Sequence, residues 1–216
     1  GGEKISKYDR SSNWTPVYKQ GDKQKDKNYR PITSLITVDK VFEQLLCSQV
    51  TSKFDPILHS LMTAYRKTHS CETTLVCLVE DWKKAIDQRE LVCVLSTDMS
   101  KAFDSLLHTL TLKKLEAYGF GPSSLSLMRS FFENRKNRVK IGNAKSEWKH
   151  MKRGCPQGSS FGPVIWNLFQ NDMAQQVTNS NLTMYADYHQ MYKIGTCLGM
   201  VKDSLEEQGK QAMSWY

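Results

Sequence analysis

The sequence predicts a mixed α+β fold for this chain of 216 residues. Apolar residues recur at helical spacing in several long segments, and shorter runs of Val, Leu and Ile are typical of strands. No internal repeat and no Gly/Ser linker divides the chain. A globular chain of this length buries roughly 70% of its unfolded surface, so we expect it to fold without a disulfide or metal staple.

The first half of the chain begins with a polar, basic segment. Trp14–Tyr18 is predicted to be extended, Gly21-Asp22 indicates a turn, and Asn28–Ile32 follows, so we expect a long hairpin arm or loop. A helix is predicted from Val38 onward. Its apolar face carries Val41, Phe42, Leu45, Leu46 and Val50.

The next two elements are a helix and a strand. A helix fits residues 71–88, where Leu75, Val79, Trp82 and Ile86 recur at helical spacing. The apolar run of residues 91–95 predicts a strand buried on both faces. Cys77 and Cys93 lie inside apolar runs and are therefore expected in the core.

The second half continues the mixed order. Gly119 suits a helix stop and Pro122 suits a first helical turn. The expected elements are helices at 109–118 and 122–133, a basic hairpin at 138–141 and 145–151, a helix at 159–177, a hairpin of strands 182–186 and 190–194 around Asp187-Tyr188, and a helix at 198–215.

The charge balance bears on partners. Thirty Lys and Arg against 22 Asp and Glu give a net charge of +8, which favours polyanions as partners, although a merely soluble basic surface is the alternative. Six cysteines without a CxxC pair indicate reduced thiols in an intracellular, reducing compartment. The longest apolar runs have five residues, which predicts no association with a membrane.

Two acidic residues stand where strands are predicted to end. Asp98 follows a strand and Asp187 lies at a hairpin tip. Either is compatible with a cap or turn. Either is also suited to hold a divalent cation, because a strand end is rigid and opens outward.

Four ordered motifs resolve this ambiguity. They are Asn28–Ile32, the D-x4-F-D segment Asp98–Asp104, the P-Q-G-S segment Pro156–Ser159, and Tyr185-Ala186-Asp187. From about Trp14 to the last residue, the chain resembles the reverse transcriptases of non-LTR (LINE-class) retrotransposons. The resemblance implies a right-hand polymerase fold, with fingers at about residues 1–90 and mostly palm at about 91–216. It also implies an RNA template, a DNA primer, a deoxynucleoside triphosphate, and a parent polyprotein with its ribonucleoprotein.

The resemblance also assigns site residues. Asp98 and Asp187 match the catalytic carboxylates that hold two Mg²⁺ ions, and Mn²⁺ is a second candidate ion. The nucleotide-site residues are Phe103 as the gate against a ribose 2′-hydroxyl, Gln157 and Gly158 beside the nucleotide, and Arg30 with Lys19 on the triphosphate.

A basic cluster is predicted to carry the template and primer. Nine Lys or Arg against two Glu lie between residues 129 and 153, and such a segment favours phosphate contacts. Trp148 and Tyr29 suit base stacking, although packing under a hairpin is the alternative. The candidate nucleic-acid residues are Arg135, Lys136, Arg138, Lys140, Lys152 and Arg153.

The chain departs from the family at the Y-A-D-D signature. Tyr188 stands where the second Asp is expected, and a neutral phenol is a poor Mg²⁺ ligand. His189 is a further candidate ligand, although imidazole suits zinc or manganese better. The sequence ends before the thumb of the family, so the thumb is expected to be absent. We expect an inactive or impaired copy, with a non-catalytic nucleic-acid-binding module or a degenerate relic as the alternatives.

Overall fold

The computed structural model describes residues 11–35, 37–99, 101–178 and 181–215. The chain forms two compact units, each built from two segments. The first unit comprises Gly1–Ser48 and Lys101–Gly162, and the second comprises Gln49–Ser100 and Pro163–Tyr216. The mixed α+β class predicted from the sequence is confirmed.

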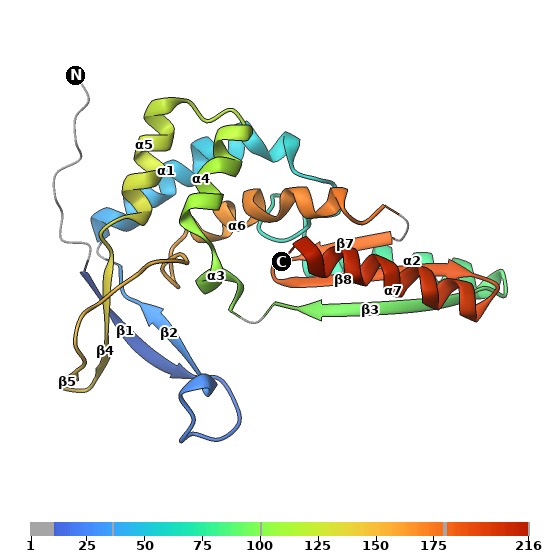
Figure 1. Ribbon diagram of the computed structural model, residues 1–216, viewed down its shortest axis with the longest axis horizontal. Coiled ribbons are helices and arrows are strands. Elements are labelled where there is room, and N and C mark those ends of the chain that lie inside the picture. Colours follow the sequence, from blue (N-terminus) through green and yellow to red (C-terminus); the bar gives the residue numbers. More distant parts are fainter. Residues whose placement is uncertain (1–10, 36, 100, 179–180, 216) are drawn as a thin grey trace. The chain divides into compact units, whose positions relative to one another are not determined.

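A sheet of short strands forms one side of the first unit (Figure 1). Strands β1 (Ser11–Tyr18) and β2 (Tyr29–Thr33) make the predicted hairpin arm. Strand β4 (Lys136–Ile141) runs parallel to β1 and pairs with β5 (Ala144–Lys145) and β6 (Lys149–His150), which confirms the basic hairpin. The order is β2-β1-β4-β5, with β6 also on β4.

Helices contribute to the hydrophobic core of the first unit. Its helices are α3 (Ala102–Ser105), α4 (His108–Ala117) and α5 (Pro122–Phe132), together with the start of α1 (Thr37–Phe54). Gly119 ends α4 with a φ of +88°, which a residue without Cβ adopts at no steric cost. Leu115, Phe132 and Phe161 are each about 1% exposed and form part of this core.

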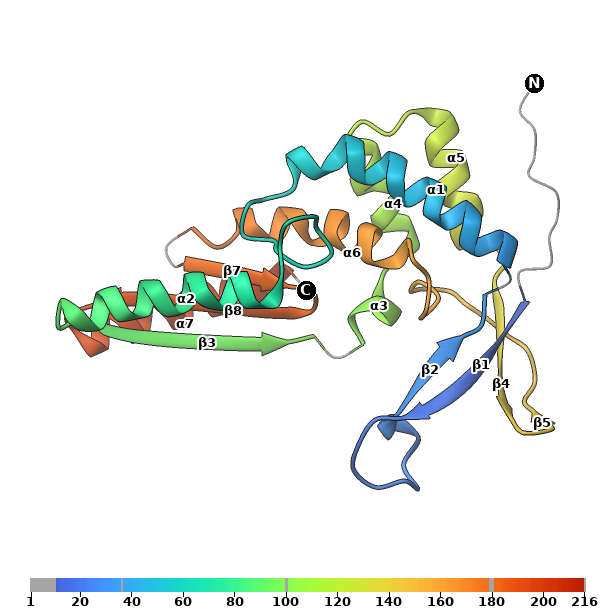
Figure 2. The ribbon, with the colours of Figure 1, turned by 180° about the vertical axis from the view of Figure 1, so that it is seen from behind.

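The second unit contains a three-stranded antiparallel sheet in the order β3-β8-β7. The strands are β3 (Leu91–Asp98), β7 (Asn181–Tyr185) and β8 (Tyr188–Gly195). Helix α7 (Leu198–Trp215) covers one face of this sheet and α2 (Cys71–Asp87) covers the other (Figures 1 and 2). Tyr192 of β8 donates a hydrogen bond of 2.6 Å to Asp81 of α2. Helix α6 (Gly162–Gln170) continues into a 3₁₀ turn at Asn171–Gln175.

Several predicted burial patterns are wrong. Strand β3 is an edge strand, and Leu91 is 43% exposed rather than buried on both faces. Helix α2 leaves Leu75 and Ile86 exposed and buries Leu78 instead. Cys77 is exposed, and Cys93 is only partly buried. Apolar spacing identified the helices correctly, but which side of a helix is covered depends on neighbours that periodicity does not contain.

One element boundary and the buried side of α1 also differ from the prediction. The helix expected at 159–177 is regular only at Gly162–Gln170. On α1, Leu46 and Val50 are buried as predicted, whereas Val41 and Leu45 are more than half exposed. The inward side of α1 instead holds Glu43, which is 1% exposed.

Candidate functional site

The carboxylates Asp98 and Asp187 lie at the same end of the sheet in the second unit. Strand β3 ends at Asp98, which is opposite Tyr188 in the register of β3 and β8. The backbone N–H of Met99 donates a hydrogen bond of 3.1 Å to the carbonyl of Asp187. The sheet therefore brings together two residues that are 89 positions apart in the sequence (187 − 98).

The hairpin that carries Asp187 is held at its tip. Tyr185 pairs with Tyr188, so the loop contains only Ala186 and Asp187, one residue earlier than the sequence suggested. Ala186 has a φ of +56°, a left-handed conformation that costs an L-residue about 1–2 kcal/mol. Its carbonyl accepts a hydrogen bond of 2.9 Å from the indole Nε1 of the fully buried Trp166. Trp166 thus fixes the backbone directly before Asp187.

Tyr188 is a strand residue rather than a turn residue. Residues directly opposite each other on antiparallel strands place their side chains on the same face, so Tyr188 shares a face with Asp98. The Tyr188 side chain is 54% exposed. A phenol therefore stands directly beside Asp98, at the position where the motif resemblance predicts a third carboxylate.

His189 points to the opposite face and is not available as a metal ligand. It is fully buried, and its Nε2 lies 3.0 Å from Oε1 of Gln170. Burial lowers the pKa of His189 to about 4, because a charged imidazolium would lose its hydration. The prediction that His189 is a candidate metal ligand is therefore wrong.

Tyr65 lies close to Asp187, and it was not among the site residues predicted from the sequence. Burial raises the pKa of the Tyr65 phenol, and the negative charge of Asp187 and the neighbouring Tyr185 raise it further. Tyr65 lies in a loop, and the next residue, Arg66, fixes this loop through a contact of 2.9 Å from its Nε to Oδ1 of Asp55. Tyr65 comes from a loop without periodicity, so no sequence pattern marks it.

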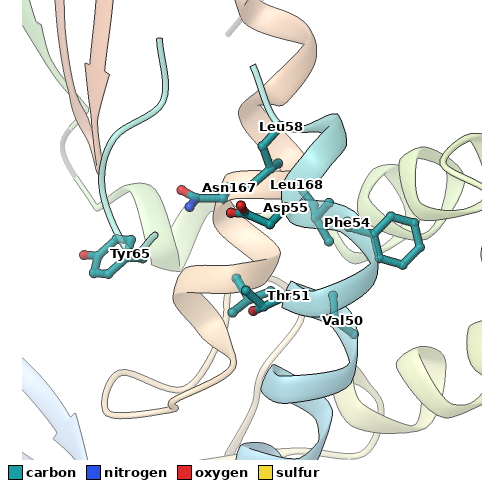
Figure 3. Close-up of a pocket in the computed structure, with 9 residues that line it drawn as sticks. Val50, Thr51, Phe54, Asp55, Leu58, Tyr65, Asn167 and Leu168 are labelled. Atoms are coloured by element: carbon teal, nitrogen blue, oxygen red, sulfur yellow. The ribbon is translucent and has the colours of Figure 1, made fainter. Parts of the chain in front are cut away.

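A small hollow adjoins Tyr65 in the second unit (Figure 3). Its volume of about 10 Å³ is the size of a single water molecule. Phe54, Leu58, Asn167 and Leu168 contribute to its wall. The hollow is too small to accept a nucleotide.

The Pro-Gln-Gly segment lies in the first unit, where its backbone is tied to two other segments. The N–H of Cys155 donates to the carbonyl of Phe103 at 2.9 Å, and the N–H of Thr33 donates to the carbonyl of Gln157 at 2.8 Å. Gly154 has a φ of +83°, and a Cβ there would lie 2.8 Å from the backbone of Asp104. Only glycine fits this close crossing.

Gln157 and Gly158 are both fixed in this segment. Nε2 of Gln157 donates a hydrogen bond of 2.8 Å to Oδ2 of Asp104, so Asp104 orients the amide. Gly158 has a φ of +104°, and a Cβ would meet the carbonyl oxygen of Thr33 at 3.0 Å. The small residue predicted here accommodates the backbone of Thr33. Phe103 is half-buried beside them.

Lys19 and Arg30 lie on the hairpin arm, and both are exposed. Arg30 is opposite Val17 in the register of β1 and β2. The backbone N–H of Lys19 donates to the carbonyl of Asn28 at 2.9 Å, directly after β1.

Most of the basic cluster is accessible. Lys140, Lys152 and Arg153 are exposed, and Lys136 is half-buried on β4. Arg138 places its guanidinium 4.2 Å from the centre of the Trp148 ring, so one face of this aromatic is already covered.

Arg135 differs from the rest of the cluster. It is 7% exposed, its Nε donates a hydrogen bond of 2.6 Å to the carbonyl of Phe131, and its guanidinium stacks over the Phe131 ring. A buried guanidinium in these contacts does not reach a phosphate. We therefore correct the predicted nucleic-acid surface by removing Arg135 from it.

The metal site offers few ligands. In the part of the chain that the structure describes, no three His, Cys, Asp or Glu side chains are grouped to hold a metal ion. Asp98 is exposed and Asp187 is partly exposed, so two oxygen donors stand at an open strand end. Mg²⁺ is commonly held by one or two carboxylates together with substrate phosphates and water, and these two residues fit that pattern.

Within residues 11–35, 37–99, 101–178 and 181–215, no helix combines the length and apolar character that crossing a membrane demands.

The fold is similar to solved telomerase structures. The apo telomerase of Candida tropicalis, truncated from its C-terminal domain, matches with a TM-score of 0.67 at 13% identity, over 97% of this chain and 47% of that chain. Telomerase from Candida albicans in complex with a fragment of telomeric RNA matches with a TM-score of 0.62 at 13% identity, over 92% of this chain and 39% of that chain. At this identity the likeness concerns the fold, and it is consistent with a right-hand polymerase.

The sequence comparisons define the family. Residues 19–193 match the family described as reverse transcriptase (RNA-dependent DNA polymerase), so the chain belongs to the reverse transcriptase family. The RNA-directed DNA polymerase from mobile element jockey of Drosophila funebris is 26% identical over 87% of this chain and 21% of its own length. The probable polymerase from transposon X-element of Drosophila melanogaster is 31% identical over 74% of this chain and 18% of its own length.

These relatives confirm the resemblance to non-LTR retrotransposon polymerases. A further relative is the Pol polyprotein from the type-1 retrotransposable element R2 of Popillia japonica, which is 21% identical over 74% of this chain and 22% of its own length. The chain spans about a fifth of the length of these curated relatives. Reverse transcriptases generally use divalent metal ions.

Proposed function

We propose that this chain is the nucleotidyl-transfer domain of a retrotransposon RNA-directed DNA polymerase, and that its activity is impaired by Tyr188. The fingers would comprise about residues 1–90 and most of the palm about residues 91–216. The substrates are an RNA template, a DNA primer and a deoxynucleoside triphosphate. The primer 3′-hydroxyl oxygen bonds to the α-phosphorus, the bond to the pyrophosphate breaks, and the hydroxyl proton leaves to solvent.

The placement of Asp98 and Asp187 at one sheet end is the observation that carries this proposal. These two carboxylates would hold Mg²⁺, or Mn²⁺ in its place. When bound, the divalent ions would neutralise charge on the transferring phosphate. The chain itself holds the two carboxylates on a rigid strand end and on a pinned hairpin, which lowers the cost of ordering them during the reaction.

Residues of the first unit would bind the nucleotide. Gln157 is oriented by Asp104, and its neighbour Gly158 lies against Thr33, so this segment is ordered before any substrate arrives. Phe103 would exclude a ribose 2′-hydroxyl. Arg30 would pair with the triphosphate as a planar fork, and Lys19 would act as a point charge beside it.

Tyr188 explains the proposed impairment. Its phenol stands beside Asp98 in place of the expected carboxylate, and a phenol is a poor ligand for Mg²⁺, which prefers carboxylates. The bulk of the ring also occupies the face on which the primer end would lie. A transition-state loss of about 4 kcal/mol corresponds to roughly a thousandfold in rate.

Primer extension on an RNA template at low salt tests this proposal. The parent chain is compared with Tyr188→Asp in Mg²⁺ and separately in Mn²⁺, and Tyr188→Phe serves as the matched control that keeps the ring without adding a carboxylate. We expect incorporation only from Tyr188→Asp. Robust extension by the parent chain would refute the impairment. Absence of extension from all three variants in both metals would refute the polymerase assignment for this chain.

A non-catalytic nucleic-acid-binding module is the second candidate function. The exposed Lys140, Lys152 and Arg153 favour it, because phosphate contacts need no metal site. Filter binding of RNA across a salt series tests this function. We expect Lys140→Ala to weaken binding and to flatten its salt dependence. An affinity that does not change with salt would contradict it.

A further inference from the structure

Glu43 is a buried carboxylate that none of the predicted site roles uses. It lies in α1 and is 1% exposed. Its Oε2 accepts a hydrogen bond of 2.9 Å from the Ser159 hydroxyl and one of 2.8 Å from the Ser160 N–H. Both donors directly follow the Pro156-Gln157-Gly158 segment. A buried carboxylate thus holds the C-terminal end of the proposed nucleotide loop.

The contact also completes the start of helix α6. The Ser159 Oγ accepts hydrogen bonds from the N–H groups of Phe161 at 3.2 Å and Gly162 at 3.1 Å, and it donates its own hydrogen to Glu43. The first N–H groups of a helix lack partners within the helix and carry partial positive charge. Glu43 therefore adds an acidic side chain to a helix N-terminus that Ser159 already caps.

Arg135 supplies the opposite charge. Burial raises the pKa of Glu43, whereas the hydrogen bonds from Ser159 and Ser160 and the positive charge of Arg135 act to lower it. Glu43, Arg135 and Asp39 line a cavity of about 30 Å³, which has room for about two water molecules. Within the described residues, Oε1 of Glu43 has no hydrogen-bond partner. The contacts of Glu43 with the loop are made through Oε2.

The other end of the loop is fixed independently. Nε2 of His108 lies 2.8 Å from the carbonyl oxygen of Gly154, and the N–H of Gly154 donates to the carbonyl of Leu106 at 2.7 Å. The N–H of Thr33 holds the carbonyl of Gln157 in the middle of the loop. After Gly158, the Glu43 carboxylate holds the Ser159 hydroxyl and the Ser160 N–H, and Sγ of Cys47, also on α1, donates a hydrogen bond of 3.2 Å to the carbonyl of Ser160.

We infer that Glu43 is a positioning residue that sets the conformation of the loop from Gly154 to Ser160, and through it the placement of Gln157 and Gly158. The link to nucleotide binding rests on the proposed function, whereas the effect on the loop does not. Loss of the Glu43 carboxylate releases the Ser159 hydroxyl and the Ser160 N–H together. The loop then samples conformations in which Gln157 no longer meets Asp104.

Amide hydrogen exchange followed by mass spectrometry tests the effect on the loop. We expect Glu43→Ala to speed exchange in a peptide covering residues 159–162 by about tenfold or more, beyond the increase in rate that a lower global stability alone would cause. Glu43→Gln keeps an acceptor oxygen and is expected to retain most of the protection. Ser159→Ala, which leaves Glu43 in place, is expected to expose the N–H groups of Phe161 and Gly162 but not that of Ser160.

Asp39→Asn is the matched control. Asp39 lies one helical turn before Glu43 and lines the same cavity, yet in the part of the chain that the structure describes it makes no hydrogen bond to the loop. Exchange in this variant is expected to match that of the parent. A uniform rise in exchange throughout Glu43→Ala, with no excess at the loop, would overturn the inference, and so would equal effects of Glu43→Ala and Asp39→Asn.

A kinetic comparison tests the link to nucleotide binding. In the Tyr188→Asp background, Glu43→Ala is expected to raise the KM for the deoxynucleoside triphosphate by about tenfold, with a smaller change in kcat. An unchanged KM would overturn that link. If Tyr188→Asp itself does not extend a primer, the proposed function fails, and the exchange result still decides whether Glu43 positions the loop.

Discussion

From the hydrogen bond between Trp166 and Ala186 we predict how much the free energy of unfolding depends on the hairpin that carries Asp187. Trp166→Phe removes the only donor atom of the indole and leaves the buried carbonyl of Ala186 without this partner. An orphaned buried acceptor costs about 1–3 kcal/mol. The smaller ring leaves a void at a fully buried position, which adds about 1 kcal/mol. We therefore expect a total loss of about 2–4 kcal/mol in the free energy of unfolding.

Urea unfolding followed by fluorescence or circular dichroism measures this loss. Each kcal/mol also lowers the melting temperature of a domain of this size by about 2–4 °C. Trp82→Phe in the same unit is the matched control, because in the described residues the Trp82 Nε1 is buried without a hydrogen-bond partner. We expect Trp82→Phe to change stability by less than about 1 kcal/mol, since it removes an unsatisfied donor.

The outcome that refutes this reasoning is a similar effect of the two substitutions. In that case the indole N–H of Trp166 would contribute nothing beyond the packing of its ring. In the Tyr188→Asp background, Trp166→Phe is also expected to reduce primer extension by more than its lower stability explains, because the left-handed Ala186 loses the contact that fixes it.

Three further predictions concern other parts of the chain. Since the pKa of His189 is lowered from 6.5 to about 4, its contribution to stability is present above pH 6.5 and is lost as the pH falls to 4. This loss amounts to about 3 kcal/mol, and urea titrations at several pH values should show it in the parent but not in His189→Gln. Leu78→Ala should cost about 2–4 kcal/mol and Ile86→Ala less than about 0.5 kcal/mol by the same assay, because only Leu78 is buried; equal costs would contradict the exposed face of α2. Gly154→Ala should destabilise by more than about 2 kcal/mol in thermal melts, because its Cβ would clash with the backbone of Asp104 at a positive φ; a melt like that of the parent would show that the crossing is looser than described.

The sequence by itself determined the elements and the family. Helices and hairpins follow from local periodicity and turn residues, so α7 (Leu198–Trp215) and the arm of β1 and β2 lie where the sequence predicted them. The ordered motifs around Asp98, Gln157 and Asp187 were sufficient to identify a reverse transcriptase of the non-LTR type, which the family match and the retrotransposon relatives confirm. Motifs are visible without coordinates because they consist of residue types at fixed spacing.

Only the tertiary structure decided which of these residues are accessible and what holds them. Arg135 and Lys140 are indistinguishable as basic residues of one segment, yet the first is buried against Phe131 and the second is exposed. Glu43 is an acidic residue that the sequence does not distinguish from an exposed one, and it is buried beside the start of α6, where Ser159 and Ser160 supply its hydrogen-bond donors. The hydrogen-bond donors to Glu43 lie 116 and 117 positions away in the chain, and partners at that separation leave no local signal.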